Sequence, residues 1–201
     1  MRALFVWFIL SGFCVQTHAQ EDALKLLESP VVKMMINGAL DKNEWSDARE
    51  LTLKKDGDHE VRVLIKYNRE HLCVAFTNLT NSDGINHNAE VLIGTKIKDT
   101  SWNANCYWFH SSYSNCSAVG LYYFWEDCTS EPVGWAANTF PFSNGNNNME
   151  FRISFSKLNI NPAKGLQIRM AFKISNPLEE QAYWPENASI ADPSTWATVA
   201  F

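Results

Sequence analysis

The sequence predicts an all-β protein, an antiparallel β-sandwich with short helical turns. About ten short apolar or alternating runs are separated by Gly, Pro, Asn and Asp turns, and no long run has a helical period. Met149, Phe151, Ile153 and Phe155 recur at every second residue, which is typical of a half-buried strand. Nine of the 26 aromatic residues fall between residues 101 and 127 and predict a hairpin. Jelly-roll and immunoglobulin-like connections both fit this pattern.

The first 19 residues are predicted to be a secretory signal peptide. Arg2 supplies a positive start, Ala3–Val15 is an apolar run, and a small residue, Ala19, closes the segment. The apolar run is too short for a stable transmembrane helix. We therefore expect cleavage after Ala19, an extracellular or periplasmic destination, and one domain over residues 20–201.

The charge pattern excludes two classes of partner. Removing Arg2 leaves 16 basic and 22 acidic residues, a net charge of −6, without a Lys/Arg cluster. Nucleic acid and anionic membrane surfaces are therefore not expected as partners. A second apolar span is also missing from the sequence, so no membrane span is expected; the oligomeric state stays open.

The elements are expected in the following order. Val31–Ile36 reads as an edge strand, Asn37-Gly38 as a turn, and Asp41 as the cap of one helical turn that Trp45 would pin to the core. Further strands are predicted at Arg49–Lys54, Glu60–Tyr67, His71–Leu79, Ala89–Ile97, Gly134–Thr139, Met149–Phe155, Leu166–Ile174 and Thr195–Phe201. The aromatic hairpin, Cys106–Tyr113 with Val119–Trp125, is expected in the middle of a sheet.

The mature chain keeps four cysteines, an even set in an oxidising compartment. Folding the hairpin about residue 117 places Cys106 opposite Cys128, because both are 11 residues from the turn. A disulfide between these two is therefore predicted, with Cys73–Cys116 as its companion. The alternative is that some of the four are free buried thiols.

One acidic cluster is a candidate calcium site. Asp56, Asp58 and Glu60 surround a glycine and a histidine, and hard cations bind clustered oxygens. The spacing is not that of a complete calcium loop, and a solvated hairpin turn accounts for the same residues. Calcium is the only cofactor that these residues suggest.

The sequence predicts no enzymatic activity. Glu90 and Glu150 are single carboxylates on different predicted strands, and a nucleophile motif is missing. Three Asn-x-Ser/Thr triplets, at Asn78, Asn115 and Asn187, would be glycosylation acceptors only in a eukaryotic secretory pathway.

Several short segments, in order along the chain, resemble family 9 carbohydrate-binding modules. The segments are Ile36–Ala48 with its Asn-Gly turn and Glu-Trp pair, Val61–Lys66, Glu70–Phe76, Ala89–Ile93, Phe151–Leu158, Tyr183-Trp184-Pro185 and Pro193–Trp196. The resemblance covers nearly the whole mature chain. It implies a β-sandwich that binds saccharides between two tryptophans with help from polar side chains, and structural calcium is common in that family.

The resemblance also implies which residues would bind the sugar. Glu90 matches the family glutamate and Trp184 the second tryptophan, whereas the loop before Glu90 contains no aromatic residue for the first. Trp102 and Trp135, both beside loops, are the candidates to replace it. The expected polar ligands are Glu90, Asn86, His87 and Asn88.

Two functional hypotheses follow. The first is a secreted, non-catalytic module that binds a glycan at a loop-lined face and supports carbohydrate breakdown. The second is a secreted structural or interaction sandwich that has lost the sugar site, which the missing loop aromatic favours. The sequence does not identify the glycan.

Overall fold

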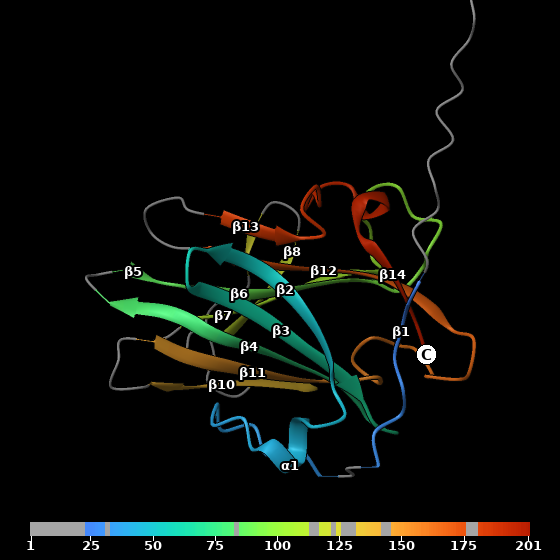
Figure 1. Cartoon of the computed structure of the whole chain (residues 1–201). Helices are drawn as coiled ribbons and strands as arrows, with labels where there is room; N and C mark the ends of the chain where they lie inside the picture. Colours follow the sequence, from blue (N-terminus) through green and yellow to red (C-terminus); the bar gives the residue numbers. More distant parts are fainter. Residues whose placement is uncertain are drawn as a thin grey trace, which may run out of the picture.

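The computed structural model describes residues 23–30, 33–82, 85–112, 117–121, 124–125, 132–141, 146–175 and 181–201. The predicted signal peptide lies outside these ranges. In the described part of the chain, two β-sheets pack face to face, with one short α-helix and one 3-10 turn (Figure 1). The predicted all-β sandwich is confirmed.

The first sheet has eight strands. Its order is β1 (Leu24–Lys25), β14 (Ala197–Ala200), β12 (Gln167–Ser175), β6 (Asn88–Gly94), β7 (Cys106–Ser111), β8 (Ser117–Leu121) and β9 (Phe124–Trp125), and β13 (Gln181–Trp184) also pairs with β12. The neighbours are antiparallel except β1 and β14, which are parallel. β13 and β14 pair with successive parts of the same edge of β12.

The second sheet has six strands, all antiparallel. Its order is β10 (Trp135–Pro141), β11 (Asn146–Ser154), β4 (His71–Ser82), β3 (His59–Tyr67) and β2 (Arg49–Asp56), with β5 (Ile85–Asn86) on β4. The strict alternation predicted at residues 149–155 covers the middle and end of β11 and the residue after it, Phe155, and its four apolar side chains are buried.

The core lies between the sheets and is rich in aromatic rings. Phe76 of β4 makes edge-to-face contacts with Phe151 of β11 at 5.9 Å and with Phe172 of β12 at 6.1 Å, so it joins both sheets. Each fully buried side chain of this size stabilises the fold by about 1.5–3 kcal/mol.

A small second core covers the outer face of the six-stranded sheet. There lies α1 (Lys42–Trp45; Figure 1), which is capped by the Asp41 side chain. It places Trp45 against Cys73 and Ala75. Two buried charges complete it. Trp45 Nε1 donates to Glu150, and Lys66 Nζ lies 2.9 Å from an oxygen of Asp47. The predicted role of Trp45 as the anchor of this turn is confirmed.

Two element predictions were wrong at the chain ends. Residues 33–36 form no strand, because their polar contacts go to side chains: Arg152 Nη1 donates to the Met34 carbonyl and the Met35 N–H donates to Glu44. The last predicted strand begins late, at Ala197, because Pro193–Thr195 form the 3-10 turn η1, with Asp192 as its cap.

The aromatic hairpin lies at the end of a sheet and not in its middle. The β7–β8 register pairs Trp108 with Gly120 and His110 with Ala118, so the chain folds about residue 114, three residues earlier than predicted. It reverses again between β8 and β9, where Leu121 pairs with Phe124.

This register removes the basis for the predicted disulfides. With the fold at residue 114, Cys106 is no longer in line with residue 128, and Cys106 and Cys73 are both free, buried thiols. The predictions of a Cys106–Cys128 and a Cys73–Cys116 disulfide were therefore wrong. Cys116 and Cys128 themselves lie outside the described residues.

Candidate functional site

A row of polar and aromatic side chains crosses the outer face of the eight-stranded sheet. In the middle of β6, Ala89, Val91 and Ile93 point into the core, so Glu90 between them points outward. Glu90 lies opposite Lys173 of β12 on one side and opposite His110 of β7 on the other. Lys173 in turn lies opposite Tyr183 of β13. Four neighbouring strands therefore supply one continuous row, Tyr183–Lys173–Glu90–His110.

Glu90 is the centre of this row and is only 2% exposed. Lys173 Nζ lies 2.9 and 3.0 Å from its two oxygens, and the Ser175 hydroxyl donates to Oε1 at 2.7 Å. Trp108 Nε1 donates to Oε2 at 2.6 Å. His110 Nδ1 is 3.9 Å from Oε1, too far for a hydrogen bond but close enough for an electrostatic contact.

The charge state of Glu90 follows from these contacts. Burial favours the neutral acid, but the neighbouring His110, Lys173 and Ser175 stabilise the carboxylate, and together they hold the Glu90 pKa below its ordinary value. The Glu90 carboxylate is therefore charged at neutral pH, and it forms a salt bridge with Lys173.

Aromatic rings flank the ion pair. Lys173 Nζ is 5.3 Å from the centre of the Trp108 ring and 5.8 Å from that of Tyr183, so the ammonium lies between two π-faces. The Trp108 ring packs edge-on against Trp102, with the ring centres 6.4 Å apart. Trp102 packs edge-on against the buried Trp196, with the ring centres 5.9 Å apart. Trp102, Trp108 and Tyr183 are all half-buried, which leaves part of each ring accessible.

Two of the sequence-predicted polar residues share this face. Asn88 begins β6 two residues before Glu90, is half-buried, and lies opposite Ser175. The structure thus brings Asn88, Glu90 and Trp102 to the outer face of one sheet. Asn86 is in β5, where its backbone pairs with Asn81 of β4.

Three other predicted ligands lie elsewhere. His87 is 2% exposed, its Nδ1 accepts from the Thr80 N–H, and burial lowers its pKa to about 4. Trp135 is 6% exposed and stacks on Phe151 between the sheets. Trp184 lies opposite Phe172, a core residue, and so points to the opposite side of the sheet from Tyr183 and Lys173.

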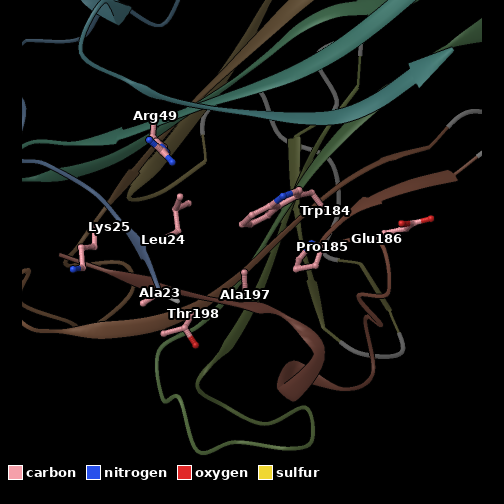
Figure 2. A pocket seen from close by; sticks show the side chains of 9 residues that line it. All are labelled: Ala23, Leu24, Lys25, Arg49, Trp184, Pro185, Glu186, Ala197 and Thr198. Atoms are coloured by element: carbon pink, nitrogen blue, oxygen red, sulfur yellow. The ribbon is translucent and has the colours of Figure 1, made fainter. Parts of the chain in front are cut away.

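Trp184 instead lines a pocket of about 670 Å³ at the edge of the sandwich (Figure 2). The wall comes from β1 and the residue before it, from β2, β13 and β14, and from the two residues that follow β13. The lining residues are Ala23, Leu24, Lys25, Arg49, Trp184, Pro185, Glu186, Ala197 and Thr198. The predicted partners Trp184 and Glu90 therefore belong to two different surfaces.

The candidate calcium residues form a hairpin turn between β2 and β3. Asp56 pairs through its backbone with His59, and Gly57 adopts a φ of +57° in the turn. Glu60 accepts a hydrogen bond from Thr52 at 2.9 Å. No group of three or more His, Cys, Asp or Glu side chains in the described part of the chain is placed to hold a metal ion.

The fold was compared with known proteins. No family model and no curated protein matches the chain. Two solved structures of a family 9 carbohydrate-binding module from Caldicellulosiruptor kristjanssonii do match. The complex with cellotriose has a TM-score of 0.66 at 12% identity, over 89% of this chain and 92% of the other. The complex with glucose has a TM-score of 0.66 at 11% identity, over 89% and 94%.

The fold is similar to that of family 9 carbohydrate-binding modules. The resemblance recognised in the sequence is thereby confirmed at the level of fold. In this CBM9-like sandwich, the residues that sequence reasoning missed are Lys173, Ser175, His110, Trp108 and Tyr183.

A signal for two of the missed residues was present in the sequence. Along β12, Ile168, Met170, Phe172 and Ile174 are buried at every second position. Lys173 and Ser175 alternate with these residues, so the period of two predicts that both point to the outer face of the sheet. The register that places them beside Glu90 has no local signature.

No helix in the described ranges is long and apolar enough to span a membrane.

Proposed function

We propose that this chain is a secreted, non-catalytic carbohydrate-binding protein that takes a glycan on the outer face of the eight-stranded sheet. The observation that carries the proposal is the buried Glu90–Lys173 pair held between the rings of Trp108 and Tyr183. A buried ion pair contributes little net stability on its own. The presence of such a pair with aromatic rings around it, on the outer face of a sheet, therefore favours a role in binding.

The chemistry of the face suits a sugar. The partly exposed side chains of Trp108, Tyr183 and Trp102 offer flat apolar surface for the C–H faces of a pyranose. Asn88 and His110 offer hydrogen-bonding groups for hydroxyls beside them. Glu90 and Lys173 are too buried to be the main contacts, so their role is to hold the surrounding rings in place. The sugar complexes of the similar modules support carbohydrate binding as the function.

The test is a titration of the mature chain with a panel of neutral oligosaccharides, followed by tryptophan fluorescence. We expect one class of glycan to shift the signal, and we expect Tyr183→Ala and His110→Ala to weaken binding about tenfold or more, since central contacts carry most binding energy. Phe140→Ala is the matched control, because Phe140 is a 46% exposed aromatic on β10 of the other sheet. A panel without any shift would reject the proposal.

A second candidate is a structural or interaction sandwich without a sugar site. It is favoured by the dispersal of the three loop tryptophans, since Trp135 is buried in the core and Trp102 and Trp184 lie on different surfaces. It predicts that every glycan leaves the fluorescence unchanged and that Tyr183→Ala changes only the free energy of unfolding.

Secretion is part of the proposal and is tested separately. The N-terminal sequence of the exported protein should begin at Gln20. An exported protein that keeps residues 1–19 would contradict the predicted signal peptide.

A further inference from the structure

The pocket at the sheet edges, separate from the proposed glycan face, has an uncompensated positive charge. Arg49 and Lys25 are both exposed, and neither side chain forms an ion pair or hydrogen bond with the part of the chain that the structure describes. Glu186 is the one acidic residue of the lining, and in Figure 2 its carboxylate points away from the pocket. The guanidinium of Arg49 points toward the space bounded by Leu24 and Trp184 (Figure 2).

Trp184 gives this pocket an aromatic wall. One side of its indole packs against Phe172, with the ring centres 5.6 Å apart and the planes tilted by 31°, so the ring is held in place from behind. The rest of the half-buried ring faces the pocket, where Leu24, Pro185 and Ala197 add further apolar surface. A fixed ring and an unpaired guanidinium in the wall of one pocket can bind a flat apolar face and an anion together.

We propose that this pocket is a second binding site, for a sugar that carries a carboxylate, that is, a uronic acid unit. The C–H face of the pyranose would stack on Trp184, and the carboxylate would accept a paired hydrogen bond from Arg49. A carboxylate fits better than a phosphate because Arg49 is the one cation that points inward, and a single positive charge matches a monoanion. Lys25 at the rim adds a longer-range attraction.

This site is independent of the proposed glycan face. Tyr183 and Trp184 are consecutive residues of β13 and point to opposite sides of the sheet, Tyr183 toward Lys173 and Trp184 toward the core side. A change at one site therefore leaves the other intact, and both can be occupied together.

The experiment titrates the mature chain with a trimer of galacturonic acid and with the matching neutral trimer of galactose, at low and high salt. We expect the acidic trimer to bind at least about tenfold more tightly, and its affinity to fall as salt rises. Arg49→Gln should weaken binding of the acidic trimer about tenfold. Arg49→Lys should weaken it less, because lysine keeps the positive charge and loses only the paired N–H donors of the guanidinium. Trp184→Phe should reduce the fluorescence change that accompanies binding.

Two control variants show whether binding of the acidic trimer depends on this pocket. Arg62→Gln removes an exposed arginine of the same sheet, one that already pairs with Glu50 at 3.0 Å, and should leave the affinity unchanged. Phe140→Ala, on β10 and outside the lining of the pocket, should also leave it unchanged.

Three results would overturn the proposal. The first is that the acidic trimer does not bind, and the second is that Arg49→Gln binds it as tightly as the wild type does. The third comes from a further titration with a sugar phosphate, if the phosphate binds as tightly as the acidic trimer.

Discussion

At the scale of single residues, Glu90 combines deep burial with four close partners, and its role is to fix the surrounding side chains. Lys173 is only 6% exposed, and its Nζ donates to both Glu90 oxygens. The buried Lys173 side chain therefore needs the Glu90 carboxylate as its partner. Removing one member of such a pair leaves the other charge buried without compensation.

We predict that Glu90→Gln lowers the free energy of unfolding at pH 7 by about 3 kcal/mol. The Glu90 pKa is lowered in the folded protein, so the carboxylate contributes stability above its unfolded pKa, and that contribution is lost as the pH falls through the folded value. The difference between the wild type and Glu90→Gln should therefore shrink as the pH is lowered below about 4. Urea unfolding at several pH values measures it, and a difference that is constant with pH would contradict the ion pair.

Cys73 is the second residue with a defined prediction. Burial raises the pKa of its thiol to about 12, so at neutral pH it is almost entirely protonated and shielded. We expect alkylation of Cys73 in the folded protein to be slower than in denaturant by orders of magnitude, as measured by peptide mass spectrometry. Rapid labelling under native conditions would show that the second core opens.

At the scale of elements, the segment before α1 is held to the six-stranded sheet by backbone contacts. The N–H groups of Asn37 and Gly38 donate to Glu150 at 2.8 and 2.6 Å, and Trp45 donates to the same carboxylate. Gly38 has a φ of +74°, and a Cβ added there would lie 2.3 Å from the Phe140 nitrogen. The close approach of this turn to β10 therefore requires glycine.

A matched pair of glycines tests this contact. Gly57 also has a positive φ, +57°, but an added Cβ would meet nothing within 4 Å. Gly57→Ala should cost about 1 kcal/mol, from backbone strain alone, whereas Gly38→Ala should cost about 3 kcal/mol or more because strain and overlap add. Thermal unfolding of both variants measures the difference, and equal costs would mean that the turn moves away from β10 freely.

At the scale of the whole molecule, the sandwich was predictable because its strands carry their own signals. The period-two pattern of β11 and the aromatic run of β7 are local, and each led to a strand that the structure contains. The second aromatic run, Val119–Trp125, was predicted as one strand, and the structure divides it between β8 and β9. The hairpin register was not predictable from the polar break alone, since the break does not indicate at which residue the chain folds. The predicted Cys106–Cys128 disulfide depended on that register and was wrong for this reason.

The candidate site was predictable only in part, for a related reason. Glu90 stands out in an apolar strand, and the resemblance to family 9 modules pointed to it. Its partners come from β7, β12 and β13, and only the pairing of these strands brings them to one row. The side to which Trp184 points depends on the β12–β13 register, so sequence reasoning placed it with Glu90 while the structure places it at the edge pocket.

Glycan binding over Trp108 and Tyr183 can be observed at the indole N–H signals of the tryptophans, in nitrogen-15 NMR spectra recorded during titration with a binding oligosaccharide. Trp108 should shift with ligand concentration, because its indole lies in the site and donates to Glu90. Trp45, 6% exposed and bonded to Glu150 on the other sheet, should stay fixed as an internal reference. A titration in which Trp108 stays fixed while the sugar binds would contradict binding at this face.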